Sequence, residues 1–221
     1  MKGKQKMKEL LEGYRIIDLS MPIYPGVLKT DNTYVWSQHQ RRFEAKQFIA
    51  TAGMCFMHFI DTETHIGTHV EGPAHLINGA PSPADLPLTT YIGEALIMKC
   101  EPIALGPKEF SKVKKGDIVL LYCDRDGCWV TPEAGKYLME IGIKMLGVQN
   151  VVPDDPRAFD LNDGTIKPET HKYLLGNNIP IIEELCNIEE TTQERCFFIG
   201  LPLRIYNIDS SWIRAIVFEK E

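Results

Sequence analysis

Three of the six histidines in this chain lie within eleven residues, and a carboxylate lies between the second and the third. The segment 65–75 reads HIGTHVEGPAH, which places His65, His69, Glu71 and His75 close together in the sequence. Neutral imidazole nitrogens and carboxylate oxygens are the usual protein ligands of zinc, manganese and iron. The composition of this segment therefore predicts a metal site.

No straight helix or strand could bring these four side chains together. A helix would place His65 and His69 on one face, but the glycines and the proline of the segment are poor helix formers. A flat strand would hold the two histidines about 13 Å apart, at roughly 3.3 Å per residue. We expect a bend at Gly67, where the missing Cβ allows unusual backbone dihedral angles. A second turn at Gly72-Pro73 would then direct His75 back toward the other side chains.

Length, composition and charge limit the classes of protein to which the chain could belong. With 221 residues, of which 44% are hydrophobic, it can bury one substantial core, and we expect a single domain with a peripheral segment at 1–13. A net charge of −6 and the absence of a basic cluster argue against a nucleic-acid partner. No apolar run approaches the ~20 residues of a membrane span, and the N-terminal segment does not resemble a signal peptide. We expect a cytoplasmic protein with no membrane partner.

The six cysteines are scattered and form no C-x-x-C pair, which favours reduced, mostly buried thiols over a disulfide framework. Cys123 and Cys128 remain a candidate redox or metal pair. His58 lies in an apolar run and is predicted to be a core histidine. A cysteine hydrolase that pairs Cys55 or Cys123 with His58 is an alternative enzyme class, although no sequence pattern links these residues.

Apolar periodicity and turn residues predict a compact α/β domain. The order of strand 116–123, a helix that begins after Thr131 and ends at Gly142, and strand 144–148 implies a right-handed crossover and a partly parallel sheet. Residues 154–165 are predicted to be a solvated loop, and residues 29–46 a surface loop or a lid over a ligand. The remaining predicted elements are strands 14–20, 55–60 (buried), 93–100, 179–185, 195–205 and 212–218, and helices 107–113 and 168–175.

Two acids within strand 179–185 indicate a second part of the site, because an unpaired buried carboxylate is costly. Strand alternation would send Glu183 and Glu184 to opposite faces, so that one faces water and the other needs a metal, an arginine or a proton. His171, at the end of the preceding helix, is a plausible neighbour. An edge strand with one exposed and one salt-bridged acid would explain the local pattern equally well.

These residues resemble the cyclase family of metal-dependent hydrolases, which includes bacterial kynurenine formamidase and isatin hydrolase. The family signature H-x-G-T-H-x-D-x-P-x-H matches residues 65–75 except that Glu71 replaces the aspartate. Further similarity lies in Asp18-Leu19-Ser20 followed by Pro22, in GDIVL at 116–120, in a histidine and a glutamate twelve residues apart, and in LPLR at 201–204. The similarity covers most of the chain from about Tyr14.

The resemblance implies roles for the matching residues and a fold for the chain. The implied metal ligands are His65, His69 and Glu71 for a first ion, and Glu71, His171 and Glu183 for a second, with Zn²⁺ or Mn²⁺ as the metal. His75 is implied as the catalytic acid and base. The family fold is a swivelling β/β/α-type domain with a mixed sheet or barrel and a few short helices, assembled as a homodimer or homotetramer.

The activity implied by the resemblance is metal-dependent hydrolysis of a carbon–nitrogen bond in a linear or cyclic amide, such as N-formylkynurenine to kynurenine plus formate, with water activated by the metal. Histidine side chains titrate near pH 6.5, so one can exchange the required protons near neutral pH. The chain departs from the family at Glu71, at Glu184 where asparagine is common, and at Gln149 where aspartate often stands. Two alternatives are a divergent member that binds metal or ligand without turnover, and a purely structural metal site.

Overall fold

The computed structural model describes residues 12–28, 34–35, 42–50, 53–101, 103–125, 127–159 and 167–220. Three predicted segments lie wholly or partly outside these residues: 1–11 of the peripheral segment, most of the loop or lid at 29–46, and 160–165 of the loop at 154–165.

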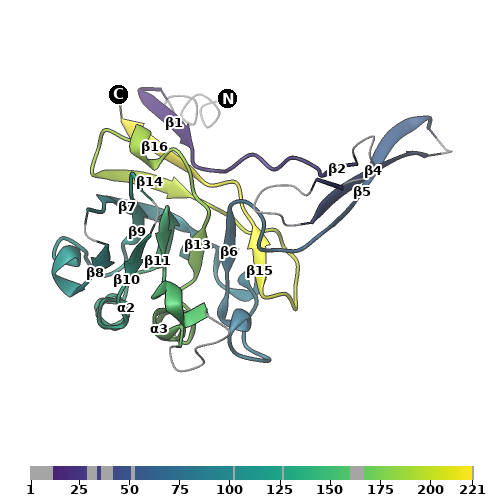
Figure 1. Cartoon of the computed structure of the whole chain (residues 1–221). Coiled ribbons are helices and arrows are strands. Elements are labelled where there is room, and N and C mark those ends of the chain that lie inside the picture. The colour runs from purple at the N-terminus through teal and green to yellow at the C-terminus, as the bar shows by residue number, and fades with distance from the viewer. Residues whose placement is uncertain are drawn as a thin grey trace.

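A curved sheet of nine strands forms the centre of the molecule (Figure 1). In spatial order the strands are β1 (Tyr14–Asp18), β16 (Ile216–Lys220), β14 (Arg195–Ile199), β7 (Ile92–Lys99), β9 (Ile118–Tyr122), β11 (Met145–Gln149), β13 (Ile181–Glu183), β6 (His69–Glu71) and β15 (Ser210–Trp212). Strands β7, β9, β11 and β13 run parallel to one another, and the pairings on either side of them are antiparallel. The predicted α/β fold with a mixed, partly parallel sheet is confirmed.

Two helices cover one side of this sheet, α2 (Pro132–Ile141) and α3 (Glu169–Leu175) (Figure 1). As predicted, Thr131 caps α2 by accepting a hydrogen bond from the Ala134 N–H, and the helix ends at Gly142 in the left-handed conformation (φ 78°). The predicted helix 107–113 is instead a short 3₁₀ turn. The described residues contain six such turns: Pro73–His75, Pro83–Asp85, Leu88–Tyr91, Pro107–Phe110, Pro156–Phe159 and Ile188–Glu190.

The centre of the sheet is buried on both faces, because β9 sends alternate apolar side chains to two separate core clusters. Val119 and Leu121 pack with Leu138 of α2 in one cluster, and Ile118 and Leu120 pack in the other. Smaller sheets flank the centre. They are formed by β8 (Ala104–Leu105), β10 (Cys128–Val130) and β12 (Val151–Val152), by β2 (Val27–Leu28) and β3 (Tyr34–Val35), and by β4 (Phe43–Ala50) and β5 (Cys55–Thr62).

The prediction of a buried strand at 55–60 was wrong. Within the described part of the chain, strand β5 pairs only with β4, and the two form a ribbon that projects away from the main body (Figure 1). Phe56 and Phe59 are 69% and 65% exposed, so the apolar character of this run does not reflect the core of the chain. His58 is exposed on the same ribbon and is therefore not a core histidine. As predicted, the six cysteines are free thiols and four of them are buried.

Three predicted strands differ from the structure in extent. The strand predicted at 195–205 ends at Ile199, and the one predicted at 212–218 is divided between the ends of β15 and β16. Strand β13 is confined to Ile181–Glu183 because Glu184 adopts a positive φ of 55°. It lies between β11 and β6, so the edge-strand explanation for its two acids was wrong. Neither helix in the described part of the chain has the length and apolar character that a membrane span requires.

Candidate active site

The histidine-rich segment bends at the two predicted positions. Gly67 has a φ of 63°, in the left-handed region where glycine is favoured. The chain then forms β6, between β13 and β15, and Gly72 leads into the 3₁₀ turn Pro73–His75. Because of these bends, a short segment directs four side chains at one point.

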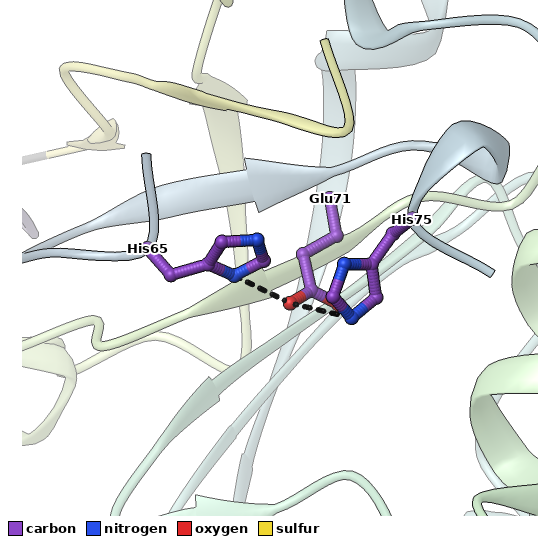
Figure 2. A group of neighbouring side chains, drawn as sticks. All are labelled: His65, Glu71 and His75. Carbon is purple, nitrogen blue, oxygen red and sulfur yellow. Dashed lines mark ion pairs between the residues drawn. The ribbon is translucent and has the colours of Figure 1, made fainter. Parts of the chain in front are cut away.

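Glu71 lies at the centre of a cluster that contains all four of the predicted histidines. Its Oε1 atom is 3.0 Å from His65 Nδ1 and 3.7 Å from His75 Nε2, and these three side chains converge in Figure 2. The same oxygen is 3.8 Å from His69 Nε2, and Oε2 is 3.2 Å from His171 Nε2. The side chain of Glu71 is 3% exposed, so this carboxylate is removed from water.

Glu183 joins the cluster from the neighbouring strand. In the antiparallel pairing of β13 with β6, Glu183 lies directly opposite His69, and such cross-strand pairs share one face of a sheet. The carboxylate of Glu183 is 4.0 Å from His69 Nε2 and 3.7 Å from His171 Nε2. The structure thus brings all six predicted site residues together: His65, His69, Glu71, His75, His171 and Glu183.

Two of the histidines are oriented by acceptors on the ring nitrogen that faces away from the cluster. His69 Nδ1 donates to the Gly67 carbonyl oxygen at 2.8 Å, which leaves the lone pair on Nε2, the atom that faces the carboxylates. His171 Nδ1 is held in the same way by Asp154, whose side chain is 1% exposed. Asp154 also accepts hydrogen bonds from the backbone N–H groups of Thr170 and His171, at 2.7 Å and 3.1 Å, in the first turn of α3.

Asp209 orients the other two histidines. Its Oδ2 atom is 2.6 Å from His65 Nε2 and 3.2 Å from His75 Nδ1, and its Oδ1 accepts a hydrogen bond from the Thr64 hydroxyl at 3.2 Å. His65 Nδ1 and His75 Nε2 therefore face Glu71. The four histidines of the cluster each have an outer acceptor, the arrangement typical of metal-ligating imidazoles.

Neither outer aspartate was identified from the sequence. Asp154 was placed in a solvated loop, which was wrong, and no role was predicted for Asp209. The acid that directly follows the apolar Val151-Val152-Pro153 was a usable signal for Asp154. Asp209 had no such signal, because a polar turn between two strands commonly contains an aspartate.

The charged groups of the cluster shift one another's titration. Burial disfavours the charged ring of His65, but the carboxylates of Glu71 and Asp209 outweigh it and raise its pKa to about 9. Burial is likewise outweighed at His171, whose pKa rises to about 10 through Asp154 and Glu71. Against the effect of burial, His65 and His75 lower the pKa of Asp209 to about 2.

The two glutamates respond in opposite directions. Burial alone would raise the pKa of Glu71, but the neighbouring imidazoles of His171, His65 and His69 hold it well below its usual range. Burial, together with the negative charge of Glu71, raises the pKa of Glu183. A divalent cation would offset the repulsion between these two carboxylates.

The donor set fits such a cation. His69 Nε2 is buried and has no hydrogen-bond partner among the described residues, although its lone pair points at two carboxylates. Two groups have ligand atoms within 4.8 Å of one another: His65 with Glu71 and His75, and His69 with Glu71 and Glu183. The first group contains His75 in addition to the ligands implied by the resemblance, and the division of ligands between two ions stays a prediction.

The alternative of a cysteine hydrolase has no support in this arrangement. Cys123 is 2% exposed and lies in the core. Cys55 and His58 lie on the exposed ribbon, where strand alternation sends them to opposite faces, and Cys55 Sγ contacts the Gly53 carbonyl oxygen.

The chain matches a known protein family and is similar to proteins of known activity. A family model described as "Putative cyclase" matches residues 17–155. The chain is 25% identical over 218 residues to kynurenine formamidase from Sphingopyxis alaskensis, with 93% of this chain and 98% of that protein covered.

Solved structures show the same fold. Isatin hydrolase A from Labrenzia aggregata superposes with a TM-score of 0.78 at 22% identity, over 100% of both chains. A protein from Bacillus stearothermophilus described as a predicted metal-dependent hydrolase gives a TM-score of 0.70 at 20% identity, over 94% of this chain and 99% of that chain.

Proposed function

Because the chain belongs to the cyclase family, we propose that it is a metal-dependent amidohydrolase that cleaves a carbon–nitrogen bond in a linear or cyclic amide. The names of its relatives, kynurenine formamidase and isatin hydrolase, support this class of reaction. Candidate substrates are therefore N-formylkynurenine, which would give kynurenine and formate, and isatin. The observation that carries the proposal is the convergence of the six predicted residues in one cluster around Glu71, in which the buried Nε2 of His69 has no hydrogen-bond partner among the described residues.

The proposed metal ligands are His65, His69, Glu71, His171 and Glu183, which would hold one or two Zn²⁺ or Mn²⁺ ions. When bound, such an ion supplies Lewis acidity that lowers the pKa of water and polarises a carbonyl group. The protein contributes the fixed ring orientations described above and a largely buried setting, in which electrostatic interactions are stronger than in water.

His75 is the proposed catalytic acid and base. Its side chain is 29% exposed, against 2% for His69 and 4% for His171, so it is the histidine of these three that a substrate could reach most readily. The Asp209 carboxylate accepts the Nδ1 proton of His75 and leaves Nε2 directed at the cluster. His75 Nε2 would take a proton from the attacking water and return it to the leaving nitrogen. Asp209 is the positioning residue in this scheme.

The remaining parts of the proposal concern partners and location. A small-molecule amide is the expected partner, and the enzyme is expected to act in the cytoplasm. Assembly as a homodimer or homotetramer is supported by the exposed apolar ribbon, because an isolated two-stranded ribbon is only marginally stable in water.

Metal analysis combined with hydrolysis assays on N-formylkynurenine and isatin tests the proposal. His69→Ala should lose both metal and activity, because it removes a buried ligand atom. His75→Ala should keep most of its metal and lose about 10²–10⁴-fold in kcat, the usual contribution of a general acid or base. His58→Ala, on the exposed ribbon, is the matched control and should match the wild type in both measurements.

The outcomes separate the proposal from its alternatives. Full metal content and full activity in His69→Ala would show that the site is assigned wrongly. Metal binding with no hydrolysis of formamides, cyclic amides or lactones would favour a binding protein without turnover. Unfolding on chelation, again without hydrolysis, would favour a structural metal site.

A further inference from the structure

Among the described strands, β15 is the last of the central sheet, next to β6, which carries two of the proposed metal ligands (Figure 1). In this antiparallel pairing Trp212 lies directly opposite His69, and Ser210 directly opposite Glu71. Residues in such cross-strand pairs share one face of the sheet. Trp212, His69 and Glu183 therefore form one row across three neighbouring strands, on the face that carries the proposed metal site.

Two hydrogen-bond donors of β15 are buried and have no partner among the described residues. They are the indole Nε1–H of Trp212 and the hydroxyl group of Ser210. Buried polar groups of native proteins are almost always hydrogen-bonded, so such exceptions need a physical reason. A cation accounts for the neighbouring Nε2 of His69, which offers a lone pair, but a cation cannot accept a hydrogen bond from an N–H group. Trp212 therefore needs an acceptor from another molecule bound within the site.

The indole ring of Trp212 is held in place by its neighbours. The ring of Phe43, which is 8% exposed, packs against it with the two centroids 5.9 Å apart and an interplanar angle of 45°. The Ser211 hydroxyl donates to the Trp212 carbonyl oxygen at 3.1 Å and accepts from the Leu203 N–H at 3.0 Å, which fixes the backbone. A donor held in this way needs little reorganisation to bind an acceptor, which is the property of groups that stabilise charge during a reaction.

We propose that Trp212 is a substrate-binding residue whose indole N–H donates a hydrogen bond to the acyl oxygen of the amide. This inference rests on the proposed function and identifies the group that holds this oxygen. Hydrolysis adds one water across the C–N bond and releases an amine and a carboxylate, so the acyl carbon carries an acceptor oxygen from substrate to product. Negative charge grows on this oxygen during the reaction, and a fixed N–H donor then stabilises it more strongly than it stabilises the bound amide.

The position of Trp212 also gives the amide a direction in the site. Trp212 lies opposite His69, the first residue of β6, whereas His75 follows the last residue of this strand. The two side chains would thus contact opposite ends of the amide group. The acyl oxygen would lie toward Trp212, and the leaving nitrogen toward His75, the proposed acid and base.

Binding of formate to the Zn²⁺-loaded protein tests this contact without turnover, because formate is the carboxylate that a formamide releases. Protein labelled with ¹⁵N in its three tryptophans gives one indole N–H resonance for each ring, and Trp212→Phe identifies that of Trp212. This resonance should move downfield in a saturable manner, because its proton enters a hydrogen bond to a charged acceptor. The Trp129 resonance should not move, and chloride at equal ionic strength should move neither. A Trp212 resonance that formate leaves in place would overturn the proposal.

Two changes at position 212 separate the N–H group from the volume of the ring. Trp212→Phe removes the donor and part of the ring, whereas 3-benzothienylalanine at this position replaces the N–H by sulfur and keeps both rings. Both proteins should retain their metal and bind formate at least about tenfold more weakly by calorimetry, the effect of a lost hydrogen bond to a charged group. Trp129→Phe, the same change in β10 of a separate sheet, is the control and should leave the affinity unchanged.

The benzothienylalanine protein decides between a substrate contact and a packing role. Wild-type affinity for formate in this protein would show that the N–H group makes no contact with the ligand, and would overturn the proposal. Loss of metal from both proteins altered at position 212 would assign Trp212 to the support of His69, and would overturn it as well.

Kinetics with N-formylkynurenine distinguish failure of this inference from failure of the proposed function. Both changes at position 212 should lower kcat by about tenfold or more and leave KM nearly unchanged, because the hydrogen bond strengthens as charge develops on the oxygen. If the wild type and both altered proteins hydrolysed the substrate equally well, the hydrolase would stand and the contact would fall. If formate moved the Trp212 resonance but no amide were hydrolysed, the carboxylate contact would stand and the hydrolase would fall.

Discussion

Replacement of Asp154 should weaken metal binding although this residue is not a proposed ligand. Asp154 accepts three hydrogen bonds within one buried site, from the backbone N–H groups of Thr170 and His171 and from His171 Nδ1. Asp154→Asn keeps the shape and one acceptor oxygen but removes the charge that holds the ring of His171. Loss of such an outer acceptor typically reduces metal affinity about 10–100-fold, which corresponds to about 1.4–2.7 kcal/mol.

The same residue supports the first turn of α3, so stability should fall as well. Asp154→Asn leaves at least one buried donor without an acceptor, at a cost of about 1–3 kcal/mol in the free energy of unfolding. Asp154→Ala leaves all three donors without one and should cost about 3 kcal/mol or more.

Competition with a chromophoric chelator would measure the affinity, and urea denaturation in excess chelator would measure the stability of the metal-free protein. Asp155→Asn is the matched control, because the adjacent carboxylate bonds Arg157, whose side chain is 70% exposed. The control should change the metal affinity less than twofold. The reasoning would be refuted if Asp154→Asn bound metal within twofold of the wild type, or if Asp155→Asn lost as much affinity as Asp154→Asn.

Three further predictions concern pH, the bend and the ribbon. Because the pKa of His65 is raised to about 9 and that of His171 to about 10, metal must displace protons at neutral pH, and its affinity should rise up to about 100-fold per pH unit below pH 9. The raised pKa values also stabilise the metal-free protein below about pH 6.5, and this stability should be lost as pH rises through 9–10 in urea titrations; a flat pH profile in both experiments would contradict the assignment. Gly67→Ala should lower the free energy of unfolding, measured by urea denaturation, by about 1–3 kcal/mol and should reduce the metal content. The reason is that φ is 63° at this position and the added Cβ would lie 2.7 Å from the Ile23 side chain. Wild-type stability and metal content in this variant would exclude a special role for the bend. Replacing Phe56 and Phe59 together by serine should reduce the oligomer to monomers in sedimentation experiments, and an unchanged sedimentation coefficient would show that the ribbon is not the contact between subunits.

The sequence predicted those parts of the site that depend on local chemistry. The bends at Gly67 and at Gly72-Pro73 could be predicted because glycine and proline favour turns. Once the chain bends at these two positions, the side chains of segment 65–75 are directed toward one region. The contribution of His171 and Glu183 depended on the family pattern, because nothing local places either residue beside Glu71. Asp154 and Asp209 were missed because their function depends on contacts with residues 17 and 134 or more positions away in the sequence.

The fold was predictable where a segment is buried on both sides and unpredictable where it is not. Strands β9 and β11, with helix α2 between them, follow from continuous apolar runs and capping residues. The run 55–60 in β5 is apolar apart from His58, so its composition could not distinguish an exposed strand from a core strand. The end of β13 could not be predicted from the sequence either, because glutamate rarely adopts the positive φ that Glu184 has.

Glu71 was the residue that the sequence left most uncertain, because the family signature has the shorter aspartate in its place. In the structure the two carboxylate oxygens of Glu71 face different histidines, Oε1 toward His65 and Oε2 toward His171. One of these histidines comes from the loop before β6 and the other from α3, so the carboxylate links the two halves of the cluster. The extra methylene group therefore does not exclude Glu71 from a bridging position. It moves the carboxylate farther from its own strand, and the ligands on α3 and β13 must lie at a matching distance for the site to bind a cation.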